Sequence, residues 1–135
     1  MGAIYASAGG TAAVGDKISY QVSGSIFTSP GANKNTTIYV PITNPQSQTD
    51  PLTKISVECK GNSAIVKDLC IAFGNTVIFS NNVDNGSKDF EIVPTSYYSK
   101  PDANPYGIDV SMTVNFSSET GTFELYSVTL QFGTA

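Results

Sequence analysis

Residues 107–132 read GIDVSMTVNFSSETGTFELYSVTLQF, and this stretch decides the fold class. Its first part alternates apolar with polar side chains, and the apolar ones are Ile108, Val110, Met112, Val114 and Phe116. Alternation with a period of two predicts a β-strand with one buried face. The small polar residues at 117–121 predict a turn, and 122–132 is predicted to be a second strand.

The second strand has a break in its pattern. Two apolar residues share one side of the alternation and four share the other, namely Phe123 and Leu125 against Tyr126, Val128, Leu130 and Phe132. One extra residue in a strand moves every following side chain to the opposite face. We therefore predict a β-bulge near Leu125 or Tyr126; the alternative is a strand end that is covered on both faces.

Shorter stretches of the same kind come earlier in the chain, at 17–23, 36–42, 55–60, 65–73, 76–79 and 90–93. Gly74-Asn75 fits a two-residue hairpin turn, Gly24 suggests a bulge, and Pro41 predicts an edge strand because proline has no N–H to donate. No stretch keeps a helical period of 3.6 residues. These about eight strands predict an all-β, single-domain antiparallel β-sandwich or jelly roll, with an open barrel as the alternative.

The chain is divided into two parts by composition. Residues 1–15 are rich in Gly and Ala and predict a flexible arm or a loosely tied first strand, and residues 16–135 are predicted to be the β-sandwich domain. The first residues lack the basic and apolar regions of a Sec signal peptide, and no apolar run is long enough to span a membrane. We expect a soluble protein that is made in the cytoplasm and has no membrane partner. Its final location, virion and extracellular release included, is left open.

The composition excludes most chemistry. The chain has no histidine and no arginine, and its eleven acidic residues and seven lysines give a net charge of −4. Histidine-based nucleophile systems are therefore excluded, and zinc ligation has few donors. Nucleic-acid binding lacks its basic stripe. A pair of carboxylates could serve a glycosidase, but no spacing singles one out, so we predict that the protein is not an enzyme.

Cys59 and Cys70 are the only cysteines. If 55–59 and 65–73 formed a hairpin, the two sulfurs would lie several residues apart along the strands, which is too far for a disulfide. Two free, mostly buried thiols are therefore predicted.

A loop at 94–106 is the leading candidate for a ligand site. It gathers aromatic rings with hydrogen-bonding side chains, namely Tyr97, Tyr98, Asp102, Asn104 and Tyr106. Flat phenol rings beside Asp and Asn suit the apolar face and the hydroxyls of a sugar, and loops at the end of a sandwich commonly carry binding sites. The alternative is that the aromatic rings only anchor a long connection over the sheet edge.

An oxygen-rich segment at 81–89 is a weaker candidate for calcium. Asp84, Asn85 and Asp89 would be the ligands, because Ca²⁺ prefers carboxylate and amide oxygens. The alternative is that Asp and Asn-Gly are simply turn formers here. No cofactor is predicted, and calcium at this segment is the weaker alternative.

Four segments together resemble a family of small, uncharacterised bacterial β domains. They are 38–45 (IYVPITNP), 52–57 (LTKISV), 64–74 and 107–116, and the resemblance covers about residues 36–133. It implies a β-sandwich and no activity, because none is established for that family. The chain lacks the Trp or His that the family usually has near the start of the first of these strands.

Two functions are consistent with these features. The first is a non-catalytic, lectin-like binding module that recognises a glycan or a protein surface through the end loops 81–89 and 94–106. The alternative is a structural subunit, such as a virion decoration, tail, coat or filament protein, that uses its N-terminal arm for subunit contacts. A homo-oligomer is expected.

Overall fold

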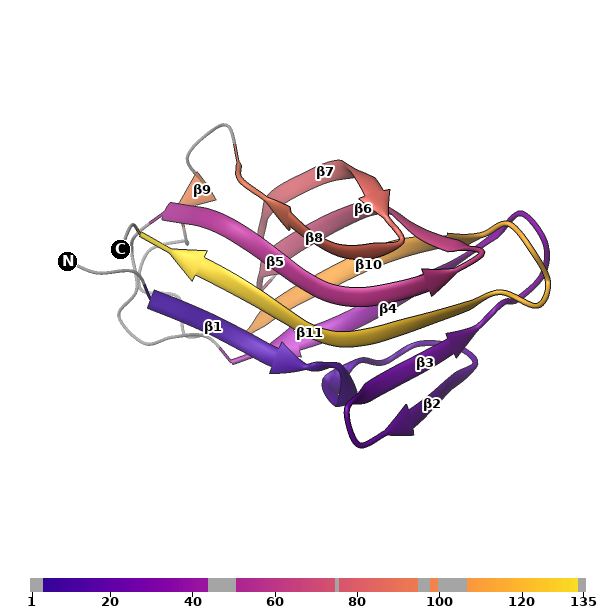
Figure 1. Cartoon of the computed structure of the whole chain (residues 1–135). Helices are drawn as coiled ribbons and strands as arrows, with labels where there is room; N and C mark the ends of the chain where they lie inside the picture. The colour runs from indigo at the N-terminus through magenta and orange to yellow at the C-terminus, as the bar shows by residue number, and fades with distance from the viewer. Residues whose placement is uncertain (1–3, 44–50, 75, 95–97, 100–106, 134–135) are drawn as a thin grey trace.

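The computed structural model describes residues 4–43, 51–74, 76–94, 98–99 and 107–133. Over these residues the chain forms eleven strands and one short 3₁₀ helix, arranged as two antiparallel sheets that face each other (Figure 1). This confirms the predicted all-β sandwich. The predicted count of about eight strands was too low, because the short strands near residues 5, 26 and 98 have no long alternating pattern of their own. In the described part of the chain, no helix is long and apolar enough to cross a membrane.

The larger sheet has seven strands in the order β2-β3-β11-β5-β8, with β1 also beside β11 and β9 also beside β5. Their bounds are β1 Ile4–Gly9, β2 Ile18–Gln21, β3 Gly24–Thr28, β5 Pro51–Asn62, β8 Lys88–Ile92, β9 Tyr98–Ser99 and β11 Thr122–Phe132. The 3₁₀ helix, Gly10–Ala12, follows β1. The long strands β5 and β11 lie next to each other at the centre of this sheet (Figure 1).

The smaller sheet has four strands in the order β4-β10-β6-β7. They are β4 Lys34–Ile42, β10 Ile108–Phe116, β6 Ala64–Phe73 and β7 Thr76–Gly86. Pro41 lies on β4 at the edge, as predicted from its missing N–H. The hairpin predicted at Gly74-Asn75 joins β6 to β7, and Gly74 has the positive φ of 58° that such a turn requires.

The core lies between the two sheets and is formed by the apolar faces that the sequence predicts. Its largest fully buried side chains are Phe27, Phe73, Phe79, Phe116, Phe123, Phe132, Ile38, Leu52, Ile55, Leu69, Ile71 and Ile108. Phe73 of β6 and Phe132 of β11 come from opposite sheets and meet edge to face, with ring centroids 5.9 Å apart and an interplanar angle of 86°. Burial of this continuous apolar layer is the main term that stabilises the fold.

The bulge predicted in the last strand is confirmed. Leu125 lies opposite Cys59 of β5 and Ser127 lies opposite Glu58, so Tyr126 is the extra residue with no partner on β5. After this point the buried positions move to the other parity, from Phe123 and Leu125 to Val128 and beyond.

Two predicted connections were wrong. Residues 17–23 are not one strand followed by a bulge at Gly24; β2 and β3 form a hairpin in which Gln21 lies opposite Gly24 and the turn residue Val22 is fully exposed. Residues 55–59 and 65–73 do not form a hairpin either. The chain passes from the larger to the smaller sheet at Ser63, whose φ is 55°. Cys59 and Cys70 therefore lie in different sheets, and both thiols are free, as predicted.

The N-terminal segment contains the first strand of the larger sheet. All six residues of β1 pair with β11 of the same chain, from Ile4 opposite Phe132 to Gly9 opposite Ser127. Val14 then makes two backbone hydrogen bonds to Tyr39 of β4, of 2.8 and 2.9 Å. The chain from β1 to residue 14 therefore contacts both sheets, while a domain boundary between residues 15 and 16 stays a prediction.

Candidate functional site

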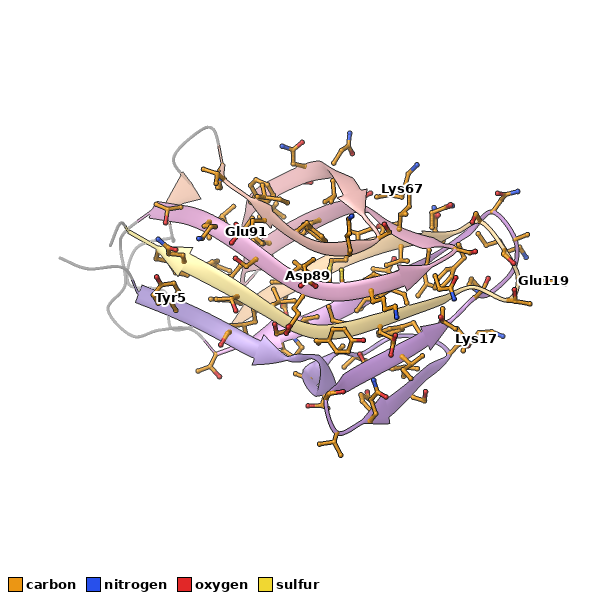
Figure 2. The ribbon with its side chains drawn as sticks, viewed as in Figure 1. Tyr5, Lys17, Lys67, Asp89, Glu91 and Glu119 are labelled. Carbon is orange, nitrogen blue, oxygen red and sulfur yellow. The ribbon has the colours of Figure 1, made fainter. Side chains whose placement is uncertain are left out.

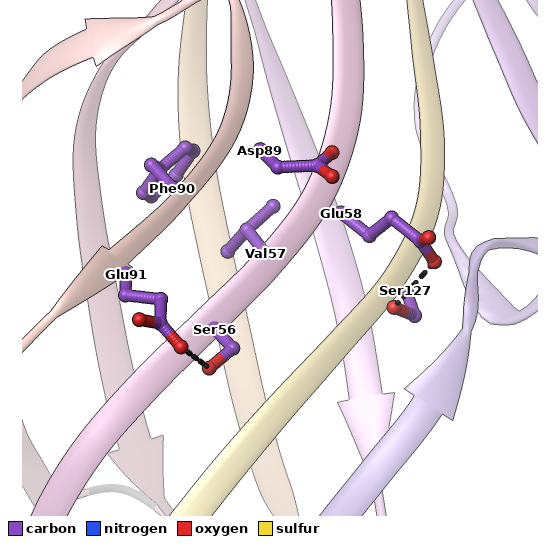
Figure 3. Close-up of a pocket in the computed structure, with 7 residues that line it drawn as sticks. All are labelled: Ser56, Val57, Glu58, Asp89, Phe90, Glu91 and Ser127. Atoms are coloured by element: carbon purple, nitrogen blue, oxygen red, sulfur yellow. Dashed lines mark hydrogen bonds between the residues drawn. The ribbon is translucent and has the colours of Figure 1, made fainter.

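An open hollow of about 490 Å³ lies on the outer face of the larger sheet, where β8, β5 and β11 run side by side (Figure 3). It is lined by Ser56, Val57, Glu58, Asp89, Phe90, Glu91 and Ser127. The strand register brings these residues together: Glu91 lies opposite Ser56, and Glu58 lies opposite Ser127. The site is therefore built on paired strands and not on loops.

Two of the carboxylates in the hollow are held by neighbouring hydroxyl groups. The Ser127 hydroxyl donates to Glu58 Oε1 at 3.2 Å, and the Ser56 hydroxyl donates to Glu91 Oε2 at 3.3 Å (Figure 3). Lys54 Nζ lies 3.5 Å from the same oxygen of Glu91. Among the described residues, the second oxygen of each carboxylate has no hydrogen-bond partner. The hollow thus offers positioned acceptors that remain open to a ligand.

Asp89, the third carboxylate, replaces a missing backbone acceptor. The pairing of β5 with β8 is irregular between Val57 and Lys60, and there Asp89 Oδ1 accepts the Cys59 backbone N–H at 2.9 Å. This bond fixes the Asp89 side chain over the sheet and leaves its Oδ2 atom without a partner among the described residues. Burial, together with the negative charge of Asp89, raises the pKa of the buried Cys59 thiol from 9.0 to about 12.

The pKa of Cys59 implies a loss of stability in alkaline solution. Below pH 9 the thiol is protonated whether or not the chain is folded. Between pH 9 and about 12 the unfolded thiol ionises while the folded one keeps its proton, so the free energy of unfolding should fall by at most about 1.4 kcal/mol per pH unit. Urea unfolding at several pH values measures this slope.

Two variants separate this effect from the titration of other groups. Cys59→Ala should have a shallower slope between pH 9 and 12. Asp89→Asn, which keeps the acceptor oxygen but removes the charge, should begin to lose stability near pH 9 like the wild type but stop at a lower pH, because the folded pKa of Cys59 is then raised less. Identical slopes for the wild type and Cys59→Ala would contradict the raised pKa.

Tyr126, the bulge residue, stands beside the hollow. Burial and the adjacent Glu124, through its charge and a hydrogen bond, raise the pKa of the Tyr126 hydroxyl above its ordinary value, and the charges of Asp89 and Glu58 add to the effect. The ring is half-exposed, and its hydroxyl lies within the field of the same carboxylates that line the hollow. An aromatic ring thus lies next to a set of free acceptors.

Two glycines make room for this bulge. A Cβ on Gly10 would lie 1.8 Å from the Leu125 carbonyl oxygen, and one on Gly24 would lie 2.2 Å from the same atom. Both glycines are buried, and the space is too small for any side chain. The position of Tyr126 therefore depends on the close approach of two backbone segments to the Leu125 carbonyl.

Most of the predicted sugar-binding residues cannot be compared with this site. Tyr97, Asp102, Asn104 and Tyr106 lie outside the described residues. Tyr98 begins β9, where its backbone lies opposite Leu52, and its side chain is not described. Binding through the loop at 94–106 stays a prediction.

The predicted calcium segment is not a loop. Residues 76–86 form β7, which continues through Gly86 opposite Val66, and β8 begins at Lys88. A Cβ on Gly86 would lie 2.4 Å from the Val66 carbonyl oxygen. Because glycine has no Cβ, β7 can approach β6 closely at this point. The side chains of Asp84 and Asn85 are outside the described set, and exposed Asp89 accepts the Cys59 N–H. Over the residues that the structure describes, no three His, Cys, Asp or Glu side chains could hold a metal ion.

Apart from Asp89, which is predicted as a calcium ligand, sequence reasoning missed the residues of the hollow. Ser56 and Glu58 were part of a polar strand face that looks like any solvated face, and nothing in the sequence connects them with Ser127. One signal was available: the change of parity at Tyr126 marked the residue that the bulge places beside the hollow.

No model of a known protein family matches the chain, and no curated protein sequence matches it either. Among solved structures, it is similar to the low-affinity xylan-binding module CBM86 from Roseburia intestinalis, with a TM-score of 0.51, 13% identity and 96% of each chain covered.

Two further solved structures have a TM-score of 0.50. One is the CBM36-1 domain of a multidomain xylanase from the hindgut metagenome of Trinervitermes trinervoides, at 9% identity over 98% of each chain. The other is TmCBM61 in complex with β-1,4-galactotriose, at 13% identity over 93% of this chain and 86% of that one. At these identities the likeness shows the β-sandwich fold alone. Membership in the uncharacterised bacterial family stays a prediction.

Proposed function

We propose that this protein is a non-catalytic glycan-binding module, and that it binds sugar on the outer face of the larger sheet, at the hollow and Tyr126. One observation carries the proposal: a half-exposed aromatic ring lies beside three carboxylates, each of which has an oxygen free to accept a hydrogen bond. A sugar presents C–H groups on one face and hydroxyl donors at its edge, so it needs both kinds of contact at once.

The neighbouring groups favour binding over catalysis. The free acceptors belong to Glu58, Asp89 and Glu91, and their other oxygens are bound to Ser127, Cys59 and Ser56. Hydrogen bonds to charged acceptors are stronger than those between neutral groups, and fixed acceptors lose little entropy when a ligand binds. The chain has no histidine to act as a base near neutral pH.

The similar folds support the same proposal. CBM86 is described as a xylan-binding module, and the TmCBM61 structure contains β-1,4-galactotriose. Xylan and β-1,4-galactan are therefore the first polysaccharides to test with this chain.

Replacing Tyr126 by alanine is expected to weaken sugar binding about tenfold, because the stacked ring contributes roughly 1 kcal/mol or more. The measurement is titration calorimetry with xylan and with β-1,4-galactan, together with retardation in gels that contain each polymer. Tyr39→Ala is the matched control, since Tyr39 is 52% exposed but lies on the smaller sheet. It should bind like the wild type.

Each outcome decides a separate point. If the wild type retains neither polymer, nor any other glycan in a wider panel, the glycan-binding function is wrong. If binding survives Tyr126→Ala but is lost in Tyr98→Ala, the site is the loop at 94–106 and not the hollow. Repeating the titration with EDTA tests the calcium prediction.

The alternative function, an assembly subunit, depends on an N-terminal arm that contacts other copies. Ile4–Gly9 instead pair with β11 of their own chain. The backbone N–H and C=O groups of these residues that face β11 are therefore not available to another copy. No observation on the described residues favours assembly over glycan binding, and a homo-oligomer stays a prediction.

A further inference from the structure

We propose that the bound glycan is an extended, uncharged chain that lies along β11 from Tyr126 to Tyr5, and not a single terminal sugar. This inference rests on the proposed function and narrows it to internal segments of neutral polysaccharides. It follows from three features of the outer face. A second aromatic ring is exposed there, the surface between the two rings carries small polar side chains, and the nearby charges are mostly negative.

The second ring belongs to Tyr5 on β1. Its side chain is 60% exposed and lies on the same outer face as the hollow, because Tyr5 is opposite Gln131 of β11 and both alternate with buried neighbours (Figure 2). Tyr126 and Gln131 are five positions apart on β11. At about 3.3 Å per residue, the two rings are separated by about 17 Å along the strand. One sugar ring is much shorter than this, so only a chain of linked sugars can contact both.

The surface between the two rings is lined by small polar side chains. The side chains that lie along it are Ser127 and Thr129 of β11, Ser7 of β1 and Ser56 of β5, all half-exposed or exposed. Ser7, Thr129 and Ser56 form one row across the three strands, opposite one another in register. Small hydroxyl side chains leave space for a chain to lie flat, and they donate to and accept from its hydroxyl groups.

The charges beside this path are mostly negative. Glu58, Asp89 and Glu91 lie beside the path, where the one lysine in the described part of the chain is Lys54, 3.5 Å from Glu91. Beyond Tyr126, outside the path, Glu124 lies opposite Lys60, which in turn lies opposite Lys88. At an ionic strength of 0.1 M, charges interact over about 10 Å, which covers a ligand on this path. A polymer of uronic acids would therefore be repelled, whereas the affinity of a neutral polymer is not lowered by these charges.

The inference is tested with xylo-oligosaccharides from the disaccharide to the hexasaccharide, by titration calorimetry. Affinity should rise about tenfold or more with length and then level off once the chain reaches both rings. Tyr5→Ala should weaken the hexasaccharide about tenfold and leave the disaccharide unchanged, while Tyr126→Ala should weaken every length. Tyr39→Ala again serves as the control. If xylo-oligosaccharides do not bind, β-1,4-galacto-oligosaccharides are used in the same way.

Polygalacturonate is the anionic probe, and its methyl ester is the neutral control with the same α-1,4 linkage. The anionic form should bind at least about tenfold more weakly than the ester at low salt, and the difference should shrink as salt is added. Affinity that does not change with length, or equal effects of Tyr5→Ala on all lengths, would overturn the extended-chain inference and leave glycan binding intact. Equal binding of polygalacturonate would overturn the preference for neutral chains. Failure of all oligosaccharides and polysaccharides to bind would instead overturn the proposed function.

Discussion

Replacing Gly10 by alanine is expected to lower the free energy of unfolding by about 3 kcal/mol, the upper part of the range for overpacking a tightly packed site. The new methyl carbon would lie 1.8 Å from the Leu125 carbonyl oxygen and 2.6 Å from its carbon. Both are backbone atoms of the central strand β11, so they cannot move aside as a flexible side chain would. Urea unfolding followed by circular dichroism measures the change.

Gly9 provides the matched control for this prediction. It is the neighbouring residue, yet a Cβ there would meet nothing closer than the Thr11 hydroxyl at 4.0 Å. Gly9→Ala should therefore leave the free energy of unfolding within about 0.5 kcal/mol of the wild type. If the two alanine variants are equally stable, the close approach of Gly10 to the bulge is wrong.

The Gly10 variant also connects the fold with the proposed site. The Leu125 carbonyl that a new Cβ would displace directly precedes Tyr126, the ring that stands beside the hollow. A shift of this peptide would move the ring relative to Glu58 and Asp89. A folded Gly10→Ala protein should accordingly bind sugar more weakly, although residue 10 itself does not line the hollow.

The sequence predicts which side chains are buried more reliably than which strands are neighbours. Alternation along 107–116 and the change of parity at Tyr126 correctly gave the inward faces and the bulge. The same pattern does not say which of two sheets a strand joins, since both inner faces are equally apolar. The pattern is therefore equally consistent with a hairpin between 55–59 and 65–73, whereas the chain crosses between the sheets at Ser63.

The candidate site is harder to predict for a related reason. Its polar side chains, among them Ser56, Glu91 and Ser127, come from three strands that are far apart in sequence, and on each strand they occupy ordinary exposed positions. Only the register of β11 with β5, and of β5 with β8, makes them a common surface. Register over such separations depends on the packing of the whole sandwich, and short-range patterns in the sequence do not contain it.

Replacing Phe132 by alanine is expected to lower the free energy of unfolding by about 4 kcal/mol, since it removes a fully buried ring and leaves a cavity between the sheets. Val77→Ala, at a position that is 59% exposed, should change it by less than about 0.5 kcal/mol and serves as the control.

Phe132 also meets Phe73 edge to face across the core. A double-mutant cycle with Phe73→Ala should therefore show a coupling of about 1 kcal/mol, measured by urea unfolding. Strictly additive losses would mean that the two rings do not stabilise each other, and a loss below about 1 kcal/mol for Phe132→Ala would contradict the full burial of the Phe132 ring.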